Sequence, residues 1–391
     1  MQSLSLPQPA LEEVAFSQQL EQLICNEIGR QGGAIPFDRY MELALYAPGV
    51  GYYTAGMRKF GAQGDFVTAP EISALFSRTL AHQVKQVLDL CGGGDVLEFG
   101  AGSGRLAVDM LQELEALDAL PERYLILELS PDLRQRQQRL VAEEIPHLGE
   151  RMQWLERLPQ QRLRGVVVAN EVMDAMPVHR FRVSSGNREM MQEEMIACTA
   201  GKLKKERRPA SAVLRQEVEK LGIELPSECE SEINLRLKPW IAAISDVLEQ
   251  GAVLLIDYGY TRSEYFHPQR SEGTLMCHFR QYAHGDALFY PGLQDITAHV
   301  DFTAVAEAAD DAGLNVAGYT NQAGFLLACG IERLLQSAAA DQNTAWFQQT
   351  GGLKRLVLPS EMGERFKVMA LTRNIDEPLM GFSMKNMLHQ L

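Results

Sequence analysis

Val96-Leu97-Glu98-Phe99-Gly100-Ala101-Gly102-Ser103-Gly104 is the stretch that decides the fold of this chain. It joins a short apolar strand to an acidic residue and three alternating glycines, and a helix is predicted to begin directly after it, at Arg105. Glycines at such a turn permit tight backbone geometry and let the main chain approach a ligand near a helix N-terminus. The stretch therefore predicts a ligand-binding turn between a strand and a helix.

The spacing of the glycines separates this loop from two common nucleotide-binding motifs. The dinucleotide fingerprint G-x-G-x-x-G would need its third glycine where Arg105 stands. A P-loop would need Gly-Lys-Ser/Thr, and Gly104 is not followed by that sequence. A P-loop is therefore excluded, and a NAD-dependent enzyme is the alternative for the core alone.

Outward from this loop, short apolar strands alternate with helical segments, which is typical of βαβ units and a doubly wound parallel sheet. The expected strands are Val96–Phe99, Leu125–Leu129, Met152–Leu155, Val166–Ala169, Ala252–Asp257, Leu314–Tyr319 and Phe366–Thr372. Helices are expected after Arg105, Pro131, Trp240, Phe302 and Gly324, and Gly251 is expected to cap the C-terminus of the third of them. Ligands of such sheets bind at the carboxyl ends of the strands, so we predict the site there.

The regions outside this core show other patterns. Helical spacing of apolar residues predicts helices over residues 11–30, 36–45 and 70–90, whereas residues 47–64, rich in glycine and aromatic residues, predict a loop or lid. A hairpin around Ser184–Asn187 and a charged stretch predict an insertion. We therefore divide the chain into an N-terminal helical and lid region (1–90), a first part of the core (91–180), an inserted substrate-side subdomain (181–250) and a second part of the core (251–391).

The motif Glu98-x-Gly-x-Gly-x-Gly resembles the first motif of class I S-adenosylmethionine-dependent methyltransferases. The resemblance implies an α/β fold with a seven-stranded Rossmann-like sheet, in which the antiparallel strand Phe366–Thr372 lies beside the fifth strand. It also implies S-adenosyl-L-methionine as the cofactor. Gly100, Gly102 and Gly104 would pass under the methionine part of that cofactor, and Glu98 would belong to the same site.

Glu128 stands where such enzymes place a carboxylate on the two ribose hydroxyls. It ends the second strand, before a helix that Ser130 caps and Pro131 begins. A carboxylate suits this task because it accepts two hydrogen bonds at once. The alternative is a solvated acid at the end of a strand. Asn170, just past the fourth strand, is the remaining residue that we expect at the cofactor.

Further motifs resemble one branch of this superfamily, the MidA-like methyltransferases, which include a mitochondrial complex I assembly factor. The resemblance covers about Ile35 to Gly330, and the stretches that carry it are Ile35–Met41, Ala44–Tyr53, Gly64–Ser73, Asn170–Val178, Ile256–Gly259 and Pro291–Phe302. It implies methylation of a protein and, for the mitochondrial member, of an arginine on a respiratory complex I subunit. The acceptor of the present chain can differ.

Two acidic residues are the catalytic candidates. Glu171 and Asp174 lie just past the fourth strand, on the substrate side of the pocket in this fold. On a helical turn, residues three apart share a face and could clamp a guanidinium group through two hydrogen bonds. The alternative is that Asp174 caps a helix and Glu171 is solvated. Transfer from a sulfonium is an in-line displacement, so we expect no metal and no covalent nucleophile.

The acceptor side offers further candidates. Asp65 and Glu71 could complete an acidic rim, and Tyr258, at the end of the fifth strand, could line the pocket. Tyr52 and Tyr53 could close over the site, although for each aromatic residue taken singly packing is the simpler explanation. A protein that presents an arginine is the expected partner.

The amino-acid composition argues against several classes of binding partner. The 391 residues carry 37 Lys and Arg against 51 Asp and Glu, a net charge of −14, which argues against nucleic acid and anionic lipid. The basic run Lys202–Arg208 is therefore interpreted as a solvated hairpin arm. Apolar runs fall far short of a membrane span. With acidic first residues and six scattered cysteines, we expect a cytosolic location and reduced thiols.

Two other functions stay open from the sequence. A small-molecule methyltransferase would use the insertion and the N-terminal region to enclose its pocket. An assembly chaperone would bind the cofactor without turnover. A homodimer is also open, and the sequence does not identify the acceptor, which could be a respiratory complex subunit.

Overall fold

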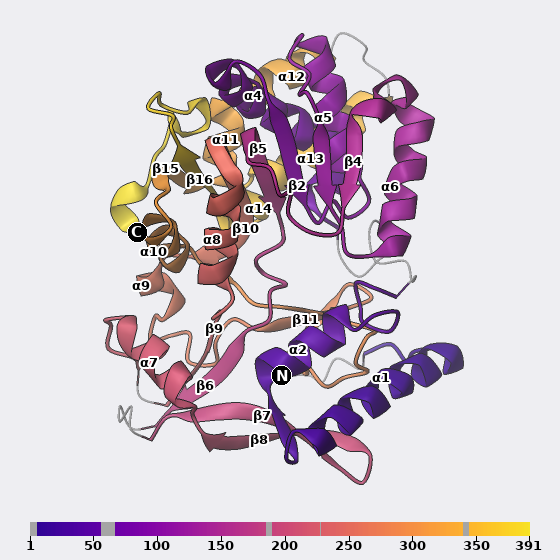
Figure 1. The fold of residues 1–391 in the computed structure, drawn as a ribbon, viewed down its shortest axis with the longest axis vertical. Coiled ribbons are helices and arrows are strands. Elements are labelled where there is room, and N and C mark those ends of the chain that lie inside the picture. Colours follow the sequence, from indigo (N-terminus) through magenta and orange to yellow (C-terminus); the bar gives the residue numbers. More distant parts are fainter. Residues whose placement is uncertain (1–5, 56–66, 185–189, 227, 339–343) are drawn as a thin grey trace. The chain divides into compact units, whose positions relative to one another are not determined.

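The computed structural model describes residues 6–55, 67–184, 190–226, 228–338 and 344–391. These residues pack as two compact units, and each unit is built from three segments of the chain (Figure 1). Unit 1 takes Met1–Phe66, Asp174–Leu237 and Arg262–His299, and unit 2 takes Val67–Met173, Lys238–Thr261 and Val300–Leu391. Residues 1–66 of the predicted N-terminal region and 181–237 of the predicted insertion belong to unit 1, whereas residues 67–90 and 238–250 belong to unit 2. The four-part division of the chain stays a prediction.

Unit 2 contains a mainly parallel sheet in the order β15-β16-β10-β5-β2-β3-β4, with the short β14 beside β10. The strands are β2 (Asp95–Phe99), β3 (Tyr124–Leu127), β4 (Met152–Leu155), β5 (Leu163–Asn170), β10 (Leu248–Tyr260), β14 (Val300–Asp301), β15 (Asn315–Asn321) and β16 (Phe366–Arg373). As predicted, β16 runs antiparallel beside the fifth strand, β10, and the structure places β15 on its other side. The α/β fold class with a Rossmann-like sheet is confirmed, with one short strand more than the seven expected.

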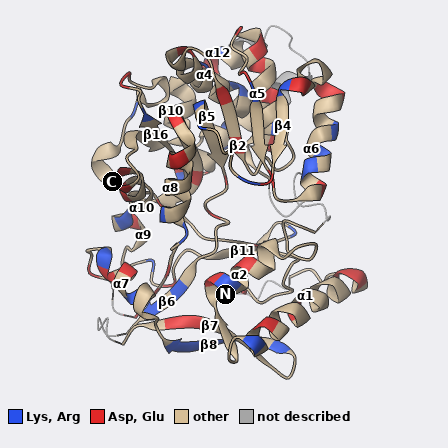
Figure 2. Ribbon diagram, viewed as in Figure 1, with Lys and Arg blue, Asp and Glu red and all other residues tan. Residues whose placement is uncertain are grey.

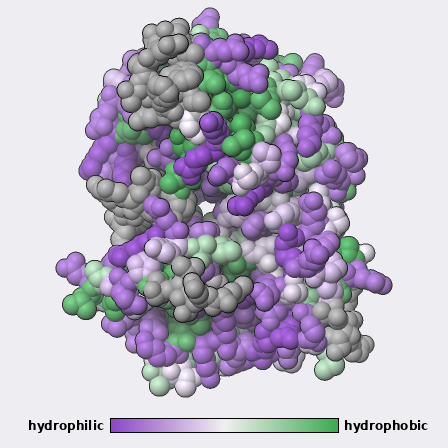
Figure 3. Space-filling model, turned by 180° about the vertical axis from the view of Figure 1, so that it is seen from behind, coloured by the Kyte–Doolittle hydropathy of each residue, from purple (hydrophilic) through white to green (hydrophobic). Residues whose placement is uncertain are grey.

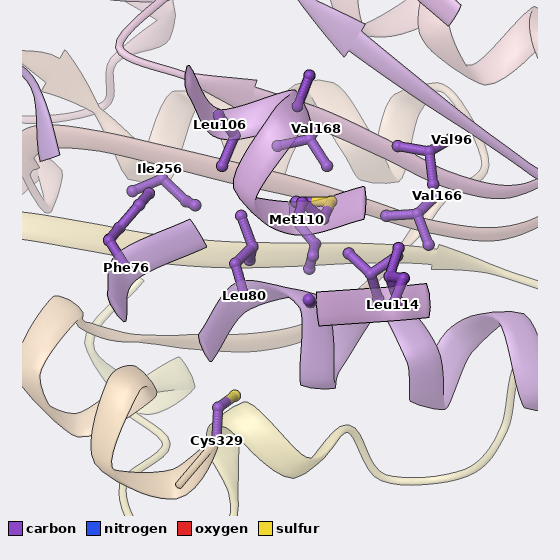
Figure 4. Packing of buried hydrophobic residues seen from close by; sticks show 14 of the residues in the cluster. Phe76, Leu80, Val96, Leu106, Met110, Leu114, Val166, Val168, Ile256 and Cys329 are labelled. Atoms are coloured by element: carbon purple, nitrogen blue, oxygen red, sulfur yellow. The ribbon is translucent and has the colours of Figure 1, made fainter. Parts of the chain in front are cut away.

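Helices pack on this sheet because their apolar stripes and the apolar strands bury each other. Figure 4 shows Phe76 and Leu80 of α4 (Ala74–Cys91) and Met110 of α5 (Arg105–Ala116) packed against strand residues such as Val168 and Ile256. The other helices of the unit are α3 (Ala69–Ile72), α6 (Pro131–Glu144), α8 (Leu237–Val247), α10 (Phe302–Asp311), α11 (Gln322–Ala328), α12 (Ile331–Ala338), α13 (Thr344–Val357) and α14 (Met362–Arg365). The strands read as continuous apolar runs because both faces of a parallel sheet are covered.

Two helix boundaries differ from the prediction. The expected helix over residues 70–90 is interrupted at Ser73, whose extended backbone ends α3 and whose hydroxyl caps α4 by accepting from the Leu75 N–H. Gly251 does not cap a helix, because α8 ends at Val247 and β10 starts at the next residue. A Cβ atom at Gly251 would lie 1.8 Å from the carbonyl oxygen of Gly165, so glycine allows β10 and β5 to approach closely.

Unit 1 is built around an antiparallel sheet in the order β1-β7-β6-β9, with β8 paired to β7. Its strands are β1 (Ala34–Pro36), β6 (His179–Val183), β7 (Gln192–Thr199), β8 (Lys202–Pro209) and β9 (Cys229–Ile233). A three-stranded sheet, β11 (Met276–Phe279), β12 (Tyr282–His284) and β13 (Asp295–Thr297), and helices α1 (Leu11–Arg30), α2 (Phe37–Tyr46), α7 (Ala212–Lys220) and α9 (Arg262–Tyr265) complete the unit. Most of the turn predicted at Ser184–Asn187 lies outside the described residues.

The basic run forms the strand β8, and acidic residues of β7 face it (Figure 2). Glu193 and Glu194 pair in register with Arg208 and Arg207, and the Lys205 ammonium lies 3.7 Å from a Glu194 carboxylate oxygen. The prediction of a solvated hairpin arm is confirmed, because much of β8 is exposed. Lysines and arginines on an outer strand also discourage pairing with another sheet edge.

The expectation of six reduced thiols is wrong. Cys25 on α1 and Cys198 on β7 form a disulfide, with Cα atoms 5.4 Å apart and a sequence separation of 173 residues. The other four cysteines are buried as free thiols. Sequence spacing could not reveal this pair, because only the packing of α1 along β7 brings the two residues together.

The described residues include no helix that is long and apolar enough to cross a membrane. Viewed from behind, the surface is mainly hydrophilic, and apolar residues gather over part of unit 2 (Figure 3).

Candidate functional site

The glycine loop between β2 and α5 has a left-handed backbone at each of its three glycines. Gly100, Gly102 and Gly104 have φ values of 59°, 55° and 87°, a region that residues with a Cβ atom rarely occupy. Gly104 is the N-cap of α5, so the loop leads directly into a helix N-terminus. The alternating glycines are therefore required by the backbone, and the loop has the shape that a close main-chain approach to a ligand needs.

Glu128 follows β3 and is held by two hydrogen bonds at the same end of the sheet. Its Oε1 accepts from the Ser130 N–H at 2.9 Å, and its Oε2 accepts from the Gln137 side-chain amide at 3.0 Å. The same Gln137 nitrogen donates to the carbonyl oxygen of Gly102 at 2.9 Å. The structure thus joins the predicted ribose-binding carboxylate to the predicted methionine-binding loop.

Glu98 lies buried at the end of β2. Burial raises the pKa of its carboxyl group to about 8, the hydrogen bond from Tyr124 lowers it, and the charge of Glu128 raises it further. A second acidic group, Asp109 on α5, also has its pKa raised, to about 6, mainly by burial. The loop is therefore preceded by a carboxyl group that burial makes hard to ionise.

Asn170 and Glu171 lie at the carboxyl end of β5. The Asn170 amide donates to Glu171 Oε1 at 3.2 Å, and the same oxygen accepts from the Ala69 N–H of α3 at 3.3 Å. From α3, the Glu71 carboxylate accepts from the hydroxyl of Ser103 in the glycine loop. The structure therefore brings three predicted site residues, Asn170, Glu171 and Glu71, together with that loop.

The proposed helical clamp of Glu171 and Asp174 is wrong in its geometry. The segment after β5 is not helical, and Glu171 has a left-handed φ of 54°. Its N–H donates to the carbonyl oxygen of Ile256 on β10 at 2.9 Å, which fixes this conformation. The boundary between the units falls directly before Asp174, so the two carboxylates belong to different units.

Asp174 lies among aromatic and acidic residues of unit 1. The Tyr53 hydroxyl donates to Asp295 at 2.9 Å, and the Tyr53 and Tyr46 rings stack with centroids 5.4 Å apart. Burial raises the pKa of Tyr53 well above its usual value, and the charges of Asp295 and Asp174 add to this effect. Tyr52 is fully buried and packs edge-on against Tyr53, so its ring contributes to the core of this unit.

Two other predicted residues have different outcomes. Tyr258 lies on β10 with its ring edge-on against Phe366 of β16, at a centroid distance of 5.5 Å, and is partly buried. Asp65 lies outside the described residues. The neighbouring Asp257 is fully buried, and its carboxylate accepts from the N–H groups of Met173 and Tyr258, so it holds the segment that follows β5.

Sequence reasoning missed two residues that connect the site. Gln137 and Ser103 join Glu128, Glu71 and the glycine loop through their side chains. A glutamine on a polar helix gives no signal in a single sequence, because most such residues are solvated. The serine lies inside the recognised motif, but its partner Glu71 is 32 residues away in sequence.

The donor set fits an adenosine-containing, amino-acid-bearing ligand. Polar groups at one end of the sheet come from the main chain of the glycine loop, the Glu128 carboxylate and the Asn170 side chain. The buried Asn170 Oδ1 has no hydrogen-bond partner in the described part of the chain. Among the described residues there is no group of three or more His, Cys, Asp or Glu that could hold a metal ion.

Comparison with known proteins gives two consistent results. A family model described as "Putative S-adenosyl-L-methionine-dependent methyltransferase" matches residues 79–320. A candidate methyl transferase from Burkholderia thailandensis, solved with bound S-adenosyl-homocysteine, is similar in structure with a TM-score of 0.93 and 42% sequence identity. The similarity covers 99% of this chain and 100% of that one.

Curated relatives extend the comparison. The mitochondrial protein arginine methyltransferase NDUFAF7 homolog of Drosophila melanogaster is 30% identical over 90% of this chain and 86% of its own length. The human protein of that name is 27% identical over 87% of this chain and 80% of its own length. The expected cytosolic location is wrong, because the fly, zebrafish, mouse and human relatives are all named as mitochondrial. That expectation rested on the charge of the first residues alone.

Proposed function

Because the chain belongs to the family of S-adenosyl-L-methionine-dependent methyltransferases, we propose that it transfers the methyl group of this cofactor to an arginine side chain of a protein. The joined pair of cofactor elements, the left-handed glycine loop and the Glu128 carboxylate, carries the cofactor part of this proposal. The names of the relatives support arginine as the acceptor.

Within this proposal, each cofactor residue has a task that its position suits. Gly100, Gly102 and Gly104 let the main chain approach the methionine part, and Glu128 accepts hydrogen bonds from the ribose hydroxyls. Asn170 offers its buried Oδ1 to a donor of the cofactor. When bound, the cofactor supplies an electrophilic methyl group on a sulfonium.

An arginine acceptor requires carboxylates in the site. A guanidinium has a pKa above about 12 and a delocalised lone pair, so it must be oriented and lose a proton to act as a nucleophile. We assign this orienting role to Glu171, which shares hydrogen bonds with Asn170 and α3. Its left-handed backbone supports the assignment, because residues held in rare conformations cluster at functional sites.

Asp174, which belongs to unit 1, stays a catalytic candidate in this proposal because of its own surroundings. Asp174, with Asp295 and the stacked Tyr46 and Tyr53 in the same surroundings, is a fitting environment for a cation, since carboxylates and aromatic faces both attract one. Glu71, Asp65 and Tyr258 stay proposed acceptor-side residues. Orientation of this kind can contribute about 7–11 kcal/mol to catalysis without a metal or a covalent intermediate.

Two finer parts of the proposal concern the partners of the chain. We propose a subunit of a respiratory complex as the first acceptor to test, because the MidA-like branch includes a complex I assembly factor. A homodimer is proposed as the assembly to look for by light scattering.

Labelling tests the proposed function. The purified chain is incubated with S-adenosylmethionine carrying a radiolabelled methyl group and with protein extract from cells that lack the gene, and labelled bands are analysed by mass spectrometry. We expect a labelled protein with methylarginine, and no label with Gly102→Val, because a side chain at φ 55° would distort the loop. Cofactor binding without any labelled protein would refute the protein acceptor.

A further inference from the structure

Gln137 is the polar side chain that physically joins the two halves of the cofactor site. It lies in the middle of α6, within the sequence Arg134-Gln-Arg-Gln-Gln-Arg139, and its side chain is fully buried. Burying a primary amide is costly unless its hydrogen bonds are made, so a buried glutamine needs an explanation. The hydrogen-bond partners of Gln137 supply this explanation.

The amide of Gln137 uses both protons of its nitrogen and also its oxygen in hydrogen bonds. Its nitrogen has two protons and donates to the Gly102 carbonyl oxygen at 2.9 Å and to Glu128 Oε2 at 3.0 Å. Its oxygen accepts from the indole N–H of Trp154, on β4, at 3.0 Å. Both acceptors lack protons and the indole nitrogen can only donate, so this is the orientation of the amide that satisfies all three partners.

This arrangement leaves few substitutes for glutamine. A glutamate would place a second carboxylate against Glu128 and against a carbonyl oxygen, which repels both. An asparagine is one methylene shorter and could not span Gly102, Glu128 and Trp154 from the same backbone position. Methionine keeps the length and the apolar volume but makes none of the hydrogen bonds.

A packing contact points to the same pair of elements. A Cβ atom at Gly104 would lie 3.2 Å from the Gln137 Cγ atom, closer than most such contacts. The last glycine of the loop is therefore also fitted to Gln137. Glu128 is fixed from its other side by the Ser130 N–H, so its carboxylate is already oriented in the chain alone.

We propose that Gln137 is a positioning residue that sets the distance and angle between the glycine loop and Glu128, and thereby adapts the site to hold the methionine and ribose parts of one cofactor at once. The inference rests on the proposed function of these two elements. Preorganisation of this kind raises affinity because the ordering of both elements is completed before binding. Gln137 itself does not touch the reacting atoms.

The test uses the full chain and a matched pair of substitutions. Gln137→Met removes the hydrogen bonds at the site, and Gln83→Met makes the same chemical change elsewhere in unit 2. Gln83 is also fully buried, and its hydrogen bonds join Gln86 and Gly381. Dissociation constants for S-adenosylhomocysteine are measured by calorimetry, and melting temperatures are measured without ligand.

We expect Gln137→Met to weaken binding about tenfold or more, since it removes a hydrogen bond to a carboxylate that must stay oriented. Gln83→Met is expected to bind within about twofold of the unchanged chain. A second readout isolates the ribose: displacement of S-adenosylhomocysteine by adenosine and by 2′-deoxyadenosine. Gln137→Met should reduce the ratio of the affinity for adenosine to the affinity for 2′-deoxyadenosine. A general loss of stability would leave this ratio unchanged.

Two results would overturn the inference. One is a folded Gln137→Met variant with unchanged affinity. The other is an equal loss of affinity in both variants with an unchanged preference for adenosine. If the unchanged chain binds neither S-adenosylhomocysteine nor S-adenosylmethionine, the proposed function fails first, so the two failures can be told apart.

Discussion

The hydroxyl of Tyr124 donates a 2.8 Å hydrogen bond to the buried carboxyl group of Glu98. This bond favours the ionised carboxylate, yet burial prevails and the pKa of Glu98 rises to about 8. In the unfolded chain the group titrates near its usual 4.5. Between these two pH values the folded chain holds a proton that the unfolded chain has lost, so the contribution of Glu98 to stability falls as pH rises.

Glu98→Gln is therefore expected to stabilise the chain relative to wild type, and more so at high pH. The gain at pH 8.5 should exceed the gain at pH 5.5 by up to about 3 kcal/mol, because the glutamine does not titrate. Urea unfolding at both pH values measures it, with the exposed Glu156→Gln as the control. A gain that does not depend on pH would contradict the assigned pKa.

Glu171→Gln is expected to separate catalysis from cofactor binding. A neutral amide cannot orient the guanidinium through charge-assisted hydrogen bonds as a carboxylate does, so the labelling rate should fall about 100-fold or more. The affinity for S-adenosylhomocysteine should change by less than about threefold. Labelling at the wild-type rate would remove Glu171 from the mechanism.

Arg180→Met is expected to destabilise the chain by about 3–5 kcal/mol. The Arg180 guanidinium is buried in unit 1, where it donates to Glu194 and Glu232 and lies over the Phe37 ring. Its loss leaves Glu232, which is 1% exposed, without this cation. Urea unfolding measures the effect, and Lys238→Ala, in an exposed pair with Asp311, should cost less than about 1 kcal/mol. Equal effects would contradict the role of burial.

The disulfide between Cys25 and Cys198 predicts a thiol count. Alkylation of the denatured chain without a reductant should modify four of the six cysteines, and alkylation after reduction should modify all six. Mass spectrometry reads the difference directly. Because the bridge closes a long loop, its reduction should lower the free energy of unfolding by about 2–4 kcal/mol. Six modified cysteines before reduction would show that the bridge does not form.

Local patterns predicted the fold well because the strands of a parallel sheet are covered on both faces and are therefore apolar in sequence. The central strands β2, β3 and β5 contain short apolar runs, and the glycines after β2 have a backbone that other residues rarely adopt. The place of β16 beside β10, by contrast, followed from the family resemblance and not from the run Phe366–Thr372 itself.

Other features depend on contacts between distant segments, and no local pattern carries them. The pairing of Cys25 with Cys198 and the contact of Glu71 with Ser103 require the finished fold. The helical spacing assumed for Glu171 and Asp174 failed because a hydrogen bond to Ile256 holds the segment in another conformation. Gly251 does not end a helix, because it lies in β10 at a point where a side chain would clash with Gly165 of β5.

The position of β16 near the end of the chain has a consequence for biosynthesis. Residues Gly251–Tyr258 of β10 pair with β16 on one side, and that partner is synthesised only after residues 261–365. At a translation rate of about 5–20 residues per second, the apolar edge of β10 stays unpaired for roughly 5–20 s before β16 is synthesised. Such an open edge is a template for pairing with other nascent chains. Translation speed across residues 261–365, and chaperones that shield this edge, would therefore govern how much active enzyme a cell obtains.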